Sequence, residues 1–248
     1  MFLEVCANSV ESAIAAEKGG ANRVELCDNL SEGGTTPSFG AIRIARKHLS
    51  IDLHVIIRPR GGDFLYNSLE LEIMKSDILE CRKIGVDGVV FGMLTQDGKI
   101  DKNLCKNFVD LAFPMKTTFH RAFDMVADPN QSLEDIISSG FDILLTSGLQ
   151  NKAINGIQLI KELVVQSNER ISIMPGSGIN ETNVLEIAKK TLAKNFHISV
   201  RKISESKMIF KNENLKMGGI QQISEFEKSI TDETKVKLIK DILETISY

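Results

Sequence analysis

Short runs of β-branched and other apolar residues alternate with longer helical patterns from one end of the chain to the other. Eight runs are predicted to be strands, at 2–7, 23–27, 52–59, 88–92, 116–120, 143–147, 171–176 and 196–200. Two of the intervening helices carry clear start signals, Asp128 followed by Pro129, and Asn180. Eight strand–helix units in 248 residues predict an α/β fold, a single (β/α)8 TIM barrel over residues 1–248.

Two other architectures fit this pattern less well. A doubly wound sheet usually has fewer strands and a glycine-rich first turn, whereas the turn at 7–12 has no glycine, so no nucleotide cofactor is expected. A solenoid would show a self-similar repeat, and the units share none. The segment at 202–231, before a last helix starting near Thr231 or Asp232, is long for a barrel loop and is interpreted as a lid, a hairpin or a dimer contact. We expect a homo-oligomer, a dimer or a tetramer.

Composition and charge narrow the functional classes. The chain is 42% hydrophobic and 25% charged, which is typical of a globular protein, and its net charge of −3 argues against nucleic acid as a partner. No apolar run is long enough to cross a membrane, and the N-terminal segment carries Glu4 without a leading Lys or Arg, unlike a signal peptide. A cytoplasmic location and four free cysteine thiols are therefore expected.

Alternation along the strands predicts an unusually polar barrel interior. On the first strand Leu3, Val5 and Ala7 share the face expected to meet the helices, while Glu4 and Cys6 share the other. The same rule assigns further residues to the interior: Arg23, Glu25, Cys27, Ile56, Arg58, Arg60, His120, Thr146, His197, Ser199 and Arg201. Buried charges must pair or reach a wet cleft. Since most of these residues lie near the carboxyl ends of their strands, we expect a functional pocket there; a structural ion-pair network is the alternative.

Glycine-rich loops follow three of the strands. Paired glycines occur at 30–38 and 58–64, where they allow close backbone approach to a ligand or movement of a lid, although ordinary tight turns would also explain them. The loop at 175–179 contains Gly176 and Gly178, and barrels often bind phosphate with this loop. Arg201 is predicted to add positive charge to that phosphate site.

Two cysteines are predicted to face each other. Cys6 and Cys27 fall at equivalent places on adjacent strands and on the same face, where two thiols suit a soft ion such as Cu(I). Simple core packing is the alternative, as it is for Cys81 and Cys105 in predicted helices. Met208 and Met217 offer further soft donors in the long last loop, although methionine more commonly serves packing.

The chain resembles the CutC copper homeostasis family over nearly its whole length. The resemblance is carried by several blocks in order: LEVCANSVESA (3–13), GGANRVELCDNLSEGGTTPS (19–38), IRPRGGDFLY (57–66), DGVVFGMLTQDGKID (87–101), TFHRAFDM (118–125), LTSG (145–148), MPGSGI (174–179) and FHIS (196–199). It implies a cytoplasmic, often oligomeric (β/α)8 barrel that handles copper, with Cu(I) binding by Cys6 and Cys27. It also implies a pocket whose matching positions are Glu4, Glu25, Arg58, Arg60, His120, Arg121, Asp124 and His197. Ser177 departs from the glycine common in relatives, which puts the phosphate site in question.

Two hypotheses follow from these residues. In the first, the protein binds Cu(I) through the two thiols and a charged pocket supports that site. In the second, it is an enzyme acting on a small anionic metabolite, with or without a phosphate group. The catalytic residues would be Glu4, Glu25, His120, Asp124 and His197, with Glu25 or Glu4 as general base and His120 as a proton shuttle near neutral pH. The binding residues would be Arg58, Arg60, Arg121, Gly176, Gly178 and Arg201.

Overall fold

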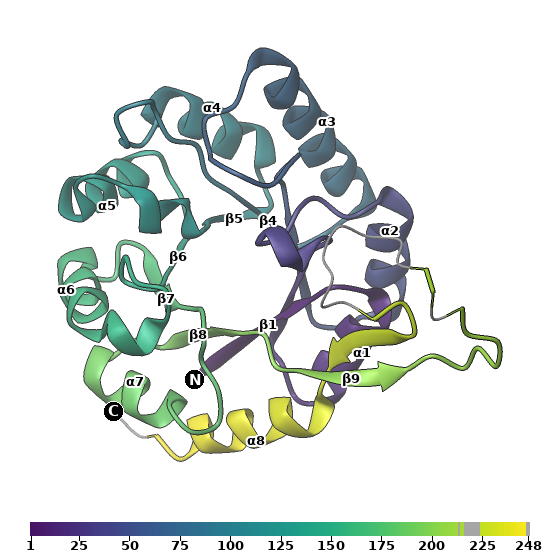
Figure 1. Ribbon diagram of the computed structural model, residues 1–248. Coiled ribbons are helices and arrows are strands. Elements are labelled where there is room, and N and C mark those ends of the chain that lie inside the picture. Colours follow the sequence, from purple (N-terminus) through teal and green to yellow (C-terminus); the bar gives the residue numbers. More distant parts are fainter. Residues whose placement is uncertain (213, 216–223, 247–248) are drawn as a thin grey trace.

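The predicted barrel is confirmed. The computed structural model describes residues 1–212, 214–215 and 224–246, and in this part of the chain an inner ring of eight parallel strands is surrounded by eight helices (Figure 1). The strands of the ring are β1 (Phe2–Ala7), β2 (Arg23–Leu26), β3 (Asp52–Ile56), β4 (Gly88–Phe91), β5 (Lys116–Phe119), β6 (Ile143–Thr146), β7 (Ser172–Pro175) and β8 (Asn195–Ile198).

Consecutive strands are neighbours around the ring, in the order β7-β6-β5-β4-β3-β2-β1-β8. β1 pairs in parallel with both β2 and β8, so the first and last strands of the ring meet. β7 and β8 lie side by side and leave the ring nearly closed. The junction between β8 and β1 places residues from opposite ends of the sequence next to each other, and Glu4 pairs with His197 in register.

Each strand is followed by a helix that covers the outside of the ring. The helices are α1 (Val10–Lys18), α2 (Phe39–His48), α3 (Ser68–Ile84), α4 (Lys102–Ala112), α5 (Pro129–Ser138), α6 (Ile157–Ser167), α7 (Val184–Thr191) and α8 (Glu233–Glu244). Asp128 caps α5 as predicted, because its carboxylate accepts from the backbone N–H groups of Asn130 and Gln131. The prediction that Asn180 caps α7 is wrong: its side chain closes a turn at Thr182, and α7 starts only at Val184.

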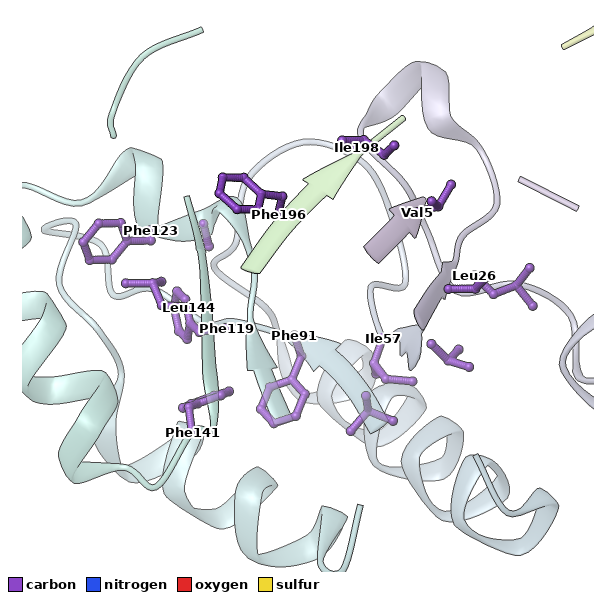
Figure 2. Close-up of a cluster of buried hydrophobic side chains, with 14 of the residues drawn as sticks. Val5, Leu26, Ile57, Phe91, Phe119, Phe123, Phe141, Leu144, Phe196 and Ile198 are labelled. Atoms are coloured by element: carbon purple, nitrogen blue, oxygen red, sulfur yellow. The ribbon is translucent and has the colours of Figure 1, made fainter. Parts of the chain in front are cut away.

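The main hydrophobic core lies between the ring and the helices. Leu3, Val5 and Ala7 are fully buried on the outer face of β1, as the alternation predicts. Aromatic side chains fill this layer beside β4 and β5. The ring centroid of Phe141 lies 5.1 Å from that of Phe91 and 5.3 Å from that of Phe119 (Figure 2). Burying one such side chain contributes about 1.5–3 kcal/mol. This shell fixes the strands, and so the side chains that point into the ring.

The barrel interior contains far less apolar packing than this outer layer. Two small clusters lie apart from the main core, one of Ile143, Leu145 and Met174 and the other of Cys6, Cys27 and Ile56. The prediction that Thr146 faces inward is wrong: Leu145 points inward and lines the cavity described below, while Thr146 bonds to Asp124. The inward-facing and outward-facing positions of β6 are therefore exchanged relative to the prediction.

The segment before α8 contains two further strands, β9 (Arg201–Glu205) and β10 (Glu227–Thr231). They pair antiparallel and form a ribbon that projects from the side of the barrel (Figure 1). Met208 is exposed in this segment, and Met217 lies outside the described residues. Among the described helices, none combines the length and the apolar character needed to cross a bilayer.

Candidate functional site

A cavity of about 660 Å³ lies at the carboxyl ends of the strands, where barrel proteins bind their ligands. Most of the residues predicted for the site line it: Cys6, Glu25, Cys27, Arg58, His120, Arg121, Asp124, Gly178, His197 and Arg201. Three predicted site residues do not line it: Glu4, Arg60 and Gly176. These ten residues come from six of the eight strands or from the loops that follow them, and they meet in one chamber.

The two thiols of the cavity are in contact. The Sγ atoms of Cys6 and Cys27 lie 3.6 Å apart, and both side chains are buried. In the pairing of β1 with β2, Cys6 lies opposite Glu25, and Cys27 lies two residues beyond Glu25. The two cysteines are therefore not directly opposite each other, as the sequence had predicted, but offset by one inward-facing position. Because the strands are staggered around a barrel, this offset still allows the two side chains to converge.

Behind the thiols lies a buried chain of charged groups. Nδ1 of His197 lies 2.6 Å from Oε1 of Glu4, whose other oxygen accepts from Nε of Arg23. Burial alone would raise the pKa of Glu4, but Arg23 and His197 outweigh that effect and lower the pKa well below its usual range. Glu4 is therefore an ion-pair partner that orients His197, and its engaged carboxylate is poorly suited to act as a general base.

His197 connects this chain to the cavity. Its Nε2 atom lies 3.8 Å from Oε2 of Glu25, and the ring lies beside the thiol of Cys6. Burial alone would lower the pKa of His197, but the contacts with Cys6 and Glu4 outweigh it and raise the pKa well above its ordinary value. The ring is consequently an imidazolium whose two N–H groups point to Glu4 and to the thiol side.

The two thiols do not share their proton equally. The hydrogen bond from Cys27 lowers the pKa of Cys6 to about 5 despite burial, with help from His197. The pKa of Cys27 is raised well above its ordinary value, because its proton is held by Cys6 and its own burial disfavours charge. Near neutral pH the pair is one thiolate and one thiol.

Glu25 completes the group on this side of the cavity. Burial, together with the Cys6 thiolate, raises its pKa to about 8, so Glu25 is mostly protonated near neutral pH. One ligand atom each from Cys6, Glu25 and Cys27 lies within 4.8 Å of the others, and the same holds for Glu4, Glu25 and His197. The donors nearest the thiols are therefore one carboxyl group and one imidazole.

His120 contributes a second buried imidazole, from the end of β5. Its Nδ1 accepts from the backbone N–H of Ala122, while Nε2 is buried without a hydrogen-bond partner in the described chain. Burial and the nearby charge of Arg58 lower the pKa of His120 to about 3. The predicted role as a proton shuttle near neutral pH does not fit these surroundings, since the ring stays neutral and offers an Nε2–H donor.

Arg58 is buried at the cavity wall and stabilises two loops. Its guanidinium donates to the carbonyl oxygens of Glu32, Gly34 and Gly62, at 2.7, 2.8 and 2.8 Å. It also lies over the ring of Phe64. These contacts explain the paired glycines at 30–38 and 58–64: both loops wrap around one cation, and Gly34 and Gly62 adopt positive φ values there.

Arg60 lies outside the cavity, contrary to the expected inward position. β3 ends at Ile56, because Pro59 and the following glycines leave the strand conformation, so the alternation no longer applies at Arg60. Its guanidinium pairs with Glu70 at 2.5 Å and with Asp63 at 3.0 Å. It anchors the loop to the start of α3 (Ser68–Ile84).

Asp124 and Arg121 belong to a 3₁₀ helix, Arg121–Met125, that follows β5. Asp124 accepts from the hydroxyl groups of Thr146 and Ser147, from the backbone of Ser147 and Leu149, and from Nε of Arg121. Every lone pair of its carboxylate is thus used to shape the loop after β6, which leaves no free base. Arg121 lines the cavity, and its Nη1 group makes no hydrogen bond within the described chain.

The loop after β7 does not present all of its backbone N–H groups to a ligand. The backbone N–H of Gly176 already bonds to the carbonyl of Thr146, and a Cβ at Gly176 would lie 2.5 Å from Leu145. Ser177 adopts a positive φ of 77° and donates its hydroxyl proton to Asn151. Arg201 is exposed on β9 at the cavity rim. Phosphate binding by this loop stays a prediction.

One interior residue was not identified from the sequence. His54 on β3 is buried, its Nδ1 has no partner in the described chain, and burial, with Arg23, lowers its pKa to about 4. It has the same strand parity as Ile56, so the alternation that predicted Ile56 also applied to it. His54 does not line the cavity and packs against Gly88 inside the barrel.

Comparison with known proteins agrees with this architecture. The model of the CutC family matches residues 1–202. The human copper homeostasis protein cutC homolog is 48% identical over 99% of this chain and 90% of its own length. A family protein CutC of Bacteroides fragilis (strain ATCC 25285) is 51% identical over 99% of this chain and 97% of its own length. A crystal structure of CutC from Streptococcus agalactiae superposes with a TM-score of 0.76 at 38% identity, covering 79% of this chain and 97% of that one.

Proposed function

The chain belongs to the CutC family, and on this basis we propose that it is a cytoplasmic copper homeostasis protein that binds Cu(I) between Cys6 and Cys27. The 3.6 Å separation of the two sulfur atoms carries this proposal. Soft thiolate ligands favour Cu(I), and the depressed pKa of Cys6 supplies one thiolate before the metal arrives.

The sulfur separation also suggests the coordination. With metal–sulfur bonds of about 2.3 Å, two sulfurs 3.6 Å apart subtend an angle of roughly 100° at the ion. Such a bent arrangement leaves room for a third donor, and the carboxyl group of Glu25 lies within 4.8 Å of both sulfurs. Two thiolates with one weaker donor would hold a soft monovalent ion, whereas a structural zinc site needs four strong ligands.

An anaerobic titration of the reduced protein with Cu(I) tests this function. We expect one ion per chain, reported by the ultraviolet absorption of copper–thiolate charge transfer. A Cys6→Ser, Cys27→Ser double variant should lose that absorption, and a Cys81→Ala, Cys105→Ala variant, which changes the two cysteines outside the cavity, should keep it. Stoichiometric binding by the first double variant would contradict the proposal.

An enzyme acting on a small anionic metabolite is the second candidate. The cavity of about 660 Å³ is far larger than one ion requires and is comparable to pockets that enclose small organic ligands. The groups free to react are Glu25, which holds a proton near neutral pH, and Cys6, whose pKa is lowered by Cys27 and His197. Either function is compatible with a homo-oligomer, a dimer or a tetramer, which light scattering of the purified protein would measure.

A further inference from the structure

Besides the thiol pair, the cavity wall carries a group of hydrogen-bond donors whose capacity the protein does not use. Arg58 and His120 are each 4% exposed, and each has a buried nitrogen without a partner in the described chain, Nε of Arg58 and Nε2 of His120. Buried polar atoms are nearly always hydrogen-bonded, so two unsatisfied donors on residues that line one cavity need an explanation.

These donors are held close together by an aromatic ring. Phe64 lies with its ring centroid 4.8 Å from that of His120 and 5.0 Å from the guanidinium carbon of Arg58. Arg121 follows His120 directly, and its Nη1 group makes no hydrogen bond within the described chain. Arg58 and His120 are therefore neighbours at Phe64, and Arg121 lines the same cavity.

The charge in this part of the cavity is not neutralised. The guanidinium of Arg58 donates to three backbone carbonyl oxygens and lies near the hydroxyl of Tyr66, and it forms no ion pair with a carboxylate of the described chain. Asp124 is paired with Arg121, and Glu32, at the exposed rim, contacts Arg58 through its carbonyl oxygen only. A buried cation without a counterion costs several kcal/mol, which an anion in the cavity would offset.

We propose that Arg58, His120 and Arg121 form a subsite for an oxyanion, the carboxylate or phosphate group of a small metabolite whose remaining atoms extend toward Glu25 and Cys6. A guanidinium and a neutral imidazole N–H are both donors, so the subsite matches an acceptor-only group. The inference rests on the second candidate function for the nature of the ligand. It is independent of copper at the thiols.

Isothermal calorimetry with inorganic phosphate and with malate, in separate arms at millimolar concentration and near neutral pH, tests the subsite. We expect the wild-type protein to bind at least one of the two probes, and the arm that responds identifies phosphate or carboxylate as the preferred group. His120→Leu removes the Nε2–H donor and should weaken binding by about tenfold or more, as for hydrogen bonds to charged groups. His120→Gln, which keeps an N–H at a similar reach, should recover part of the affinity.

His54→Leu is the matched control, because His54 is an equally buried histidine that does not line the cavity. It should bind the probes like the wild-type protein. Absence of binding to both probes, or equal binding by His120→Leu and wild type, would overturn the subsite. Cu(I) titration of the same variants separates the two proposals, since failure of the oxyanion subsite leaves copper binding intact and failure of the thiol site leaves probe binding intact.

Discussion

Nδ1 of His197 lies 2.6 Å from Oε1 of Glu4, at the junction where the last strand of the barrel meets the first. This contact joins residues 193 positions apart in the chain and fixes the ring so that its other nitrogen points to the thiol side. A carboxylate that orients a histidine beside a metal ligand or a nucleophile is a recurrent device in proteins. His197, held in this way, adds to the hydrogen bond with Cys27, which is the main cause of the lowered pKa of Cys6.

The first prediction concerns the thiolate of Cys6. Because Cys27 and His197 stabilise the charged form, thiolate absorbance of the metal-free protein should rise with a midpoint near pH 5, the value to which the pKa of Cys6 is lowered. The transition should vanish in Cys6→Ser and move to higher pH in His197→Gln. Cys81→Ala is the control and should leave it unchanged, because burial raises the pKa of Cys81 to about 12. A wild-type transition only above pH 8 would refute this assignment.

Proton release on copper binding gives the second prediction. Near neutral pH the pair holds one proton, on Cys27, whose pKa is raised well above its ordinary value. Binding of Cu(I) by two thiolates should then release close to one proton per ion. Calorimetry in buffers that differ in ionisation enthalpy measures this number. Release of two protons also by Glu25→Gln, which has no carboxyl proton to lose, would mean that Cys6 is a thiol in the free protein.

The third prediction concerns the pH dependence of stability at Glu25. Its folded-state pKa is about 8, raised from 4.5 mainly by burial, so the folded state retains a proton that the unfolded chain loses. Its contribution to stability is fully present below about pH 4.5 and is lost as the pH rises to about 8, by at most about 1.4 kcal/mol per pH unit. Glu25→Gln should therefore stabilise the protein more at pH 8 than at pH 5.

Urea unfolding of wild type and Glu25→Gln at the two pH values measures that difference. Glu186→Gln, at a half-exposed ion pair on α7 (Val184–Thr191), is the control and should show little dependence on pH in this range. An equal effect of Glu25→Gln at both pH values would show that Glu25 ionises in the folded protein as it does in the unfolded chain.

A fourth prediction concerns the buried ion pair of Glu4 and Arg23. Both side chains are at least nine-tenths buried, so Glu4→Gln leaves a buried cation without its counterion and should lower the free energy of unfolding by about 3–5 kcal/mol. Glu186→Gln breaks a surface pair with Lys190 and should cost less than about 1 kcal/mol. Urea unfolding compares the two. A small loss in Glu4→Gln would mean that Arg23 reaches solvent or another partner.

Strand periodicity predicted the inward-facing residues on three strands that contribute to the site. On β1, β2 and β8 the alternation correctly assigned Glu4, Cys6, Glu25, Cys27 and His197 to the interior. It could not give the stagger between strands, so the pairing of Cys6 with Glu25, and the contact of His197 with Glu4, required the closed barrel.

The alternation failed on two other strands, for different reasons. Pro59 ends the strand pattern before Arg60. The guanidinium of Arg60 then pairs with Glu70 outside the cavity. The opposite phase of β6, with Leu145 inside, depends on packing against Met174 that no local pattern reveals. The environment of His120 could not be predicted from the sequence either, because its low pKa arises from burial and from Arg58, which is distant along the chain.

Competition for Cu(I) against a chelator of known affinity tests the central claim most directly. We predict that Cys6→Ser and Cys27→Ser each weaken the affinity for Cu(I) by roughly 100-fold or more, beyond the effect of losing an outer partner of a ligand. Cys81→Ala and Cys105→Ala, at buried cysteines outside the cavity, should match the wild-type protein. Wild-type affinity in both Cys6→Ser and Cys27→Ser would contradict the account.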